Sequence, residues 1–229
     1  MGRIFNFDGP FFSFFSRLAD LFWLNLLYII CCIPIVTIGA ATTALYYVTL
    51  KMAKDEESYI TKSFFKSFKD NFKQATIIWL IFFVILIIMV TDLFIINGGT
   101  FDNIFNNKSI SNIVLVAVGI IGMVVTFILT YVFPLLARFD NTVKNTIKNA
   151  FLISVRHLPY TVAMIVISII PVAIIYFSAP ATILIVIMFS LVAYINSKFF
   201  NKIFVFYMPK VEVEDSEDKV FHDESILED

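Results

Sequence analysis

The chain has 229 residues, of which 59% are hydrophobic and only 15% charged, and its mean hydropathy is +0.88. A water-soluble domain of this length cannot keep so much apolar surface out of water, and the apolar runs lack the period-two alternation of a transmembrane barrel. The composition therefore predicts an all-α, polytopic transmembrane helical bundle with additional amphipathic helices at the membrane interface.

The apolar runs predict about six membrane segments within a single domain, 1–207. The first run, Leu18–Leu50, would measure about 50 Å as one helix, which exceeds a hydrocarbon core of about 30 Å. A break is therefore expected between Pro34 and Gly39, and the short segment after it either crosses the membrane or re-enters it. The six expected segments are 18–36, 40–52, 74–96, 112–136, 159–177 and 180–197.

The break in the first run, CIPIVTIGA, allows two interpretations. Broken helices at membrane depth often line ligand sites, so Pro34, Thr37 and Gly39 join the mid-span Asn25 as a candidate intramembrane polar site. The favoured interpretation is a turn at the outer face of the membrane, with Asn25 as a hydrogen-bonding contact between helices.

The next segment, SFFKSFKDNFK, separates two faces when its residues are placed at about 100° intervals. This pattern predicts an amphipathic helix in the headgroup layer, with aromatic rings toward the lipid and ammonium groups toward anionic headgroups. The alternative is a connecting helix that packs on protein. The candidate membrane-interface or docking residues are Lys62, Phe64, Phe65, Lys66, Phe68, Lys69, Phe72 and Lys73.

The distribution of charge predicts the orientation. If both termini and the segments 51–73 and 137–158 face the cytoplasm, sixteen of the 17 Lys and Arg residues lie inside and only Lys108 lies outside. We therefore expect a multi-pass protein of the bacterial cytoplasmic membrane with cytoplasmic N- and C-termini. Residues 208–229, with two lysines against nine acidic residues, are expected to form an acidic cytoplasmic tail.

Motifs for catalysis, metal binding and cofactor binding are absent from the sequence. It contains no GxxxxGK[ST], HExxH or GxSxG pattern, and its two histidines, His157 and His222, are far apart. We expect a protein that is not an enzyme, holds no cofactor or metal and binds no nucleic acid. The expected partner is the lipid bilayer with its anionic headgroups.

One further pattern covers the first third of the chain. It combines Leu18-Ala19-Asp20, the Pro34–Gly39 break, Tyr46-Tyr47, Asp55-Glu56-Glu57 and the lysine–phenylalanine helix. Together these features resemble the YesL-like family of bacterial integral membrane proteins of unknown function. The resemblance implies a role accessory to carbohydrate uptake or its regulation, with ABC-transporter components or a membrane sensor as partners. The alternative function is a small transporter or permease subunit that moves a solute through the bundle.

Overall fold

The computed structural model describes residues 10–56, 59–97, 108–177 and 184–208, and the described chain is helical throughout, with no strand in these ranges. The acidic tail, apart from Met208, lies outside the described residues. The helices, in chain order, are α1 (Pro10–Cys32), η1 (Ile35–Thr37), α2 (Ile38–Met52), α3 (Ile60–Asn97), α5 (Lys108–Arg138), α6 (Val143–Arg156), α7 (Leu158–Phe177), α8 (Ile185–Phe204) and η3 (Val205–Tyr207).

Five helices are long and apolar enough to cross a membrane, and each overlaps one of the first five predicted segments. They cover Ser13–Cys32, Ile35–Met52, Ile60–Ile96, Asn112–Arg138 and Leu158–Phe177. The sixth predicted segment, 180–197, corresponds to α8, which is not among these five. Polar side chains are concentrated in the second half of α8, where Asn196, Lys198 and Lys202 lie within two turns of one another.

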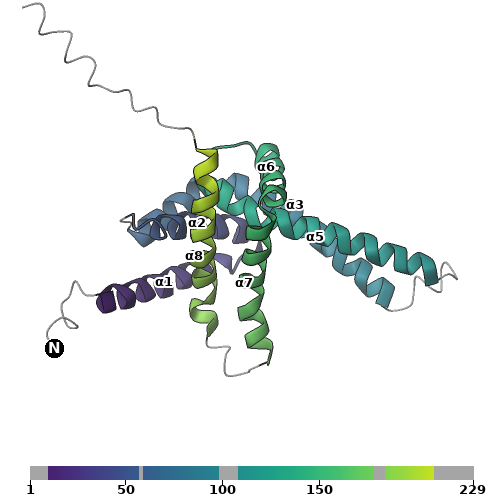
Figure 1. Ribbon diagram of the computed structural model, residues 1–229, viewed down its shortest axis with the longest axis horizontal. Helices are drawn as coiled ribbons and strands as arrows, with labels where there is room; N and C mark the ends of the chain where they lie inside the picture. The colour runs from purple at the N-terminus through teal and green to yellow at the C-terminus, as the bar shows by residue number, and fades with distance from the viewer. Residues whose placement is uncertain (1–9, 57–58, 98–107, 178–183, 209–229) are drawn as a thin grey trace, which may run out of the picture.

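The helices are arranged in pairs around a common core (Figure 1). Helices α3 and α5 run side by side and extend together away from the core, and α7 and α8 form a second pair that runs crosswise to the first in this view. Helix α1 approaches from another side, and α6 lies over the end of the bundle near the C-terminal end of α8. The resulting bundle is splayed.

The main core lies where these pairs meet, and large aromatic side chains fill it. Tyr131 of α5 and Phe200 of α8 are fully buried, and their ring centroids are 5.2 Å apart in an edge-to-face arrangement. The Tyr131 hydroxyl lies 2.9 Å from the hydroxyl of Thr161 in α7, so its polar atom has a partner inside the bundle. These contacts hold α5, α7 and α8 together at one point.

A second, smaller core joins α1, α2, the start of α3, and α8. Its buried members include Leu24, Leu45, Val48, Phe64 and Ala193. Because Phe64 belongs to this core, the first turns of α3 are fixed to the body of the protein.

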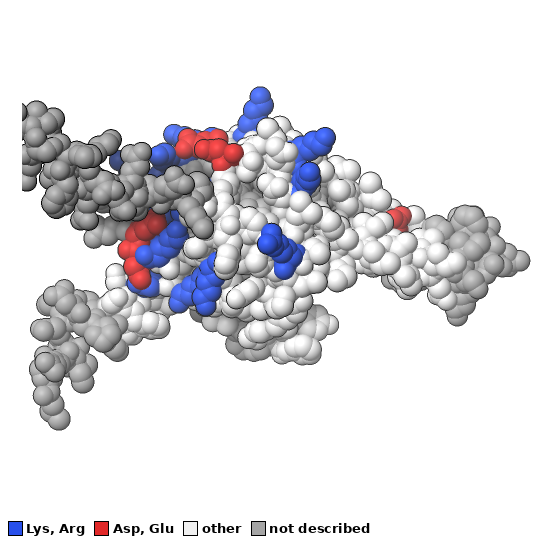
Figure 2. Space-filling model, turned by 45° about the horizontal axis from the view of Figure 1, so that its top comes forward, with Lys and Arg blue, Asp and Glu red and all other residues white. Residues whose placement is uncertain are grey.

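Charge is unevenly distributed on the molecule (Figure 2). Lys and Arg side chains gather over one half of the face shown, whereas the arm formed by the far ends of α3 and α5 is almost entirely uncharged. Many large apolar side chains are exposed on that arm, including Ile88 (55%), Phe94 (76%) and Ile120 (61%). An uncharged arm with exposed apolar side chains is what contact with lipid requires.

Candidate functional site

The break between the first two apolar segments is a compact turn whose polar atoms are bonded within the protein. Helix α1 ends at Cys32, and Pro34 takes an extended conformation before the single turn of η1. The Thr37 hydroxyl lies 2.5 Å from the carbonyl oxygen of Cys31 and 2.7 Å from that of Pro34. Because the turn uses this hydroxyl itself, the geometry favours a structural turn over a ligand site.

The position of Gly39 shows why the sequence has no side chain there. Gly39 is buried in the first turn of α2, at a close crossing with α3, and a Cβ atom at this position would lie 2.4 Å from the Ala75 carbonyl oxygen and 2.7 Å from the Trp79 Cβ. Contacts that short do not occur, so only glycine lets the two helices approach this closely. The sequence places Gly39 at the end of the expected break, and the structure places it in the first turn of α2, where it packs against α3.

A contact with α3 places this turn within the bundle. Trp79 donates its indole N–H to the Ile35 carbonyl oxygen at 2.8 Å. At about 1.5 Å per residue, Trp79 is about 28 Å along α3 from Ile60 and about 27 Å from Asn97. The turn therefore lies against the middle of α3, well away from the Asn97 end that the predicted topology assigns to the outer face.

A second contact joins the first helix to the beginning of α3. Trp23 of α1 donates its indole N–H to the Thr61 hydroxyl at 2.9 Å, so α1 also lies beside the first turns of α3. Helices α1 and α2 thus form a hairpin alongside the amphipathic half of α3.

Asn25 forms a buried polar contact between α1 and α8. Its side-chain N–H donates to the Ile185 carbonyl oxygen at 2.9 Å, and its side-chain oxygen accepts the Ser190 backbone N–H at 3.0 Å. The Ser190 hydroxyl in turn donates to the Leu21 carbonyl oxygen at 2.6 Å. Both ends of the Asn25 amide are therefore used for joining helices, and Asn25 does not meet the Pro34–Gly39 turn.

The predicted amphipathic segment is the beginning of α3, a single helix of 38 residues that continues into the apolar arm. Its four rings do not share one environment. Phe64 is completely buried in the second core and Phe68 is partly buried, whereas Phe65 and Phe72 remain 39% and 41% exposed. The expectation that all four rings face lipid is therefore wrong, because Phe64 packs against protein.

The opposite face of this segment, which we call the lysine face, consists of Lys62, Lys66, Lys69 and Lys73. All four side chains are exposed. The ion pairs within the described residues are Arg17–Asp55 at 2.6 Å and Lys54–Glu56 at 3.9 Å, and neither involves the lysine face. Asp70 is exposed on the same segment, so this surface carries a net positive charge that is not neutralised by ion pairs in the described chain.

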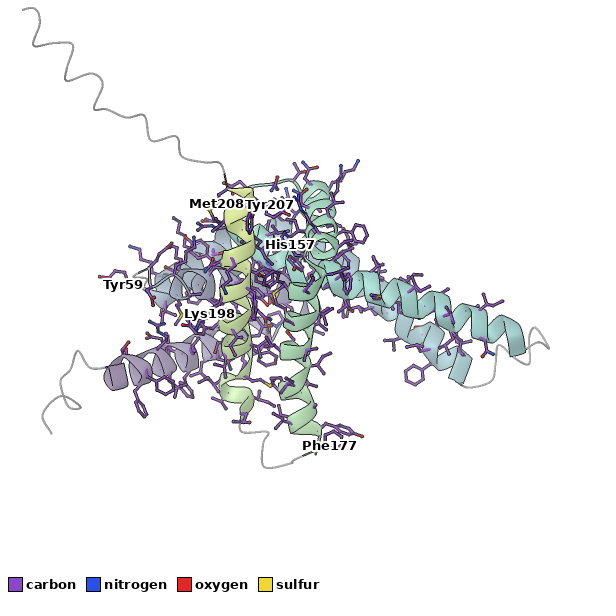
Figure 3. All side chains as sticks on the ribbon, in the orientation of Figure 1. Tyr59, His157, Phe177, Lys198, Tyr207 and Met208 are labelled. Carbon is purple, nitrogen blue, oxygen red and sulfur yellow. The ribbon has the colours of Figure 1, made fainter. Side chains whose placement is uncertain are left out.

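A second basic region lies at the junction of α5, α6 and η3, within the basic segment 137–158 that the sequence predicts to face the cytoplasm. Arg138 contacts the Met208 sulfur, Arg156 lies over the Tyr207 ring, and His157 Nε2 lies 3.1 Å from the Tyr207 hydroxyl. Figure 3 shows His157, Tyr207 and Met208 near one another, at the end of the α7–α8 pair opposite Phe177. Because His157 and Tyr207 are 50 residues apart in sequence, no local pattern predicts this contact.

No group of three or more metal-ligating side chains capable of holding an ion occurs within the described ranges. The two cysteines, Cys31 and Cys32, are free thiols at the end of α1.

Apolar helices of spanning length, with charge gathered on one part of the bundle, define a polytopic α-helical membrane protein. Residues 21–93 match the family described as a protein of unknown function, DUF624. The chain is also 28% identical, over 130 residues, to the uncharacterized protein YteU of Bacillus subtilis (strain 168). These matches confirm the resemblance to a YesL-like family of unknown function.

The match to YteU covers 56% of this chain and 55% of the relative, so the chain spans about half of that protein's length. No solved structure is similar to this chain.

Proposed function

We propose that the protein is an accessory or scaffold protein of the bacterial cytoplasmic membrane that docks an acidic partner on the lysine face of α3. The observation that carries the proposal is the lysine face itself: four exposed ammonium groups on one helix, with none in an ion pair among the described residues. Its function is binding rather than catalysis.

The packing of α3 supports a protein partner for this face. Phe64 and Ala75 are fully buried, so the helix is anchored to the body of the protein along the side opposite the lysines. From Lys62 to Lys73 the row is about 17 Å long at about 1.5 Å per residue. An anchored row of this length presents a defined positive surface that complements a row of carboxylates, and such complementarity gives specificity and speeds association.

The orientation of the proposed complex follows from the positive-inside rule, which places the lysine face in the cytoplasm together with both termini. The family resemblance supplies a candidate partner class, the components of a carbohydrate uptake system or a membrane sensor that regulates it. The alternative function, a transporter with Asn25 as a solute ligand, draws no support from the geometry, because both ends of the Asn25 amide are bonded to α8.

The proposal is tested by affinity purification from native membranes in a mild detergent. The wild-type protein is expected to recover a partner in an association that weakens with rising salt, because exposed charges are screened. Reversal of all four lysines to glutamate should abolish the association, and the matched replacement by arginine should preserve it. Recovery of the protein alone, or of the same partner with the glutamate variant, would contradict docking on this face.

A further inference from the structure

A cavity of about 340 Å³ lies at the junction of α5, α6 and η3, away from the lysine face. Its wall combines apolar and polar side chains. The lining residues are Leu135, Phe139, Asn141, Asn149, Leu152, Ile153, Arg156 and Tyr207.

The polar side of this cavity consists of hydrogen-bonding groups that the protein does not use for its own packing. The side-chain amides of Asn141 and Asn149 make no hydrogen bond within the described chain, and Arg156 takes part in no described ion pair. The Arg156 guanidinium carbon lies 6.0 Å from the centroid of the Tyr207 ring. The cavity therefore offers a cation and several donors to a ligand.

The cavity wall is held in place by contacts from other elements. The Gln74 side-chain amide donates to the carbonyl oxygen of Asn141, which ties α3 to the segment before α6. His157 Nε2 lies 3.1 Å from the Tyr207 hydroxyl, a contact that can be followed in Figure 3. When the Nε2 N–H donates to the Tyr207 oxygen, the Tyr207 O–H is left to donate into the cavity.

The charge around the cavity selects an anion. Arg156 is joined by Arg138 at the end of α5 and by Lys148 on α6, whereas Asp140 is the acidic residue of this region. None of these side chains is in an ion pair in the described part of the chain. Positive charge in excess at the mouth of a polar cavity favours a phosphate or carboxylate group.

The depth of the cavity and the side chains beside it favour an amphiphile over a free anion. The cavity lies where one apolar segment ends, at Arg138, and the next begins, at Leu158, which is the expected level of the phospholipid headgroups. Leu152 lines the cavity and is 52% exposed, and Val155 on the same helix is 44% exposed. Apolar side chains at this level can contact acyl chains while the polar wall contacts the headgroup.

We propose that this cavity binds the phosphate group of an anionic phospholipid. Arg156 pairs with the phosphate, the amides of Asn141 and Asn149 and the hydroxyl of Tyr207 donate to its oxygens, and Leu152 contacts the adjoining acyl chain. The site is independent of docking on the lysine face, since it uses other residues of other helices.

The test measures the thermal unfolding of the full-length protein in a neutral detergent while a short-chain phosphatidylglycerol is added. We expect a saturable rise in Tm that short-chain phosphatidylcholine and inorganic phosphate do not reproduce. Arg156→Gln should weaken the apparent phosphatidylglycerol affinity about tenfold or more, because it removes a charge-assisted contact. Lys144→Gln, which removes the same charge from α6 outside the cavity lining, should change the affinity less than about twofold.

Three results would overturn the proposal. Equal stabilisation by phosphatidylcholine would show that the headgroup charge is not recognised. Equal stabilisation by inorganic phosphate would show a site for small anions rather than for a lipid. Unchanged affinity in Arg156→Gln, or in Asn149→Asp as a second variant that adds a negative charge to the wall, would place lipid binding elsewhere.

Discussion

The indole N–H of Trp79 donates to the carbonyl oxygen of Ile35, and this 2.8 Å contact fixes the α1–α2 turn against the middle of α3. The indole ring thus joins two parts of the chain that are 44 residues apart. A turn held here cannot lie beside Asn97 at the C-terminal end of α3. The contact therefore decides where the first two helices stand relative to the rest of the bundle.

Replacing Gly39 by alanine is expected to destabilise the protein by about 1–3 kcal/mol, because the new Cβ would overlap the backbone of α3. The nearest atom is the Ala75 carbonyl oxygen, 2.4 Å away, and a backbone atom cannot move aside without displacing its helix. Thermal or denaturant unfolding in detergent measures the loss. Gly119→Ala is the matched control, since no atom lies within 4 Å of its Cβ position. An equal effect of the two substitutions would contradict the close crossing of α2 and α3.

The position of the turn can be tested by labelling single cysteines after Cys31 and Cys32 are replaced. Val36 is 47% exposed in the turn, and we expect Val36→Cys to resist an impermeant thiol reagent added from outside. Arg3→Cys and Lys66→Cys should both react only from the cytoplasmic side. A turn at the outer face would instead make Val36→Cys reactive from outside, and external labelling of Arg3→Cys would exclude a cytoplasmic N-terminus.

The helices themselves could be predicted from sequence, because continuous apolar runs of spanning length leave few other structures. Whether each apolar face contacts lipid or other helices could not be predicted from sequence. The helical pattern separates Phe64 from the lysines correctly, yet a ring on an apolar face is equally compatible with lipid and with a protein core. The structure places Phe64 in a core. It also places the α1–α2 turn beside the middle of α3, a contact that could not be predicted because apolar length does not reveal which part of α3 a helix will contact.

The candidate sites differ in how much sequence could reveal. The lysine face is a local pattern, and its exposure agrees with the helical spacing. The pairing of Asn25 with Ser190 and the contact between His157 and Tyr207 both join distant parts of the chain. Nothing periodic marks such contacts, so they emerge only when α1, α6, α7 and α8 are placed together.

Asn25→Ala is expected to lower stability by about 1–2 kcal/mol, since it removes two buried contacts between α1 and α8. Unfolding in detergent gives the change, and Asn145→Ala at an exposed position of α6 should stay within about 0.5 kcal/mol of the wild type. The same variant also distinguishes a structural role of Asn25 from a role in solute transport. A variant with wild-type stability that had lost solute flux in reconstituted liposomes would favour the transporter alternative over a helix contact.

His157 is expected to make the stability of the protein depend on pH. Burial, and secondly the positive charge of Arg156, lower the pKa of His157 below its ordinary value of 6.5. The His157 imidazole is therefore harder to protonate in the folded state than in the unfolded state. As the pH falls below about 6.5, the unfolded protein binds more protons than the folded protein, and the free energy of unfolding decreases in that range. The measurement is Tm in detergent between about pH 8 and about pH 5.

Carboxylates also titrate toward the acid end of this range, so the Tm of the wild type is compared with that of His157→Gln at each pH. The His157→Gln variant should lose less stability on acidification. His222→Gln, in the C-terminal tail, serves as the control and should retain the wild-type profile. A His157→Gln profile that coincides with the wild type would show that the imidazole does not contribute to this pH dependence.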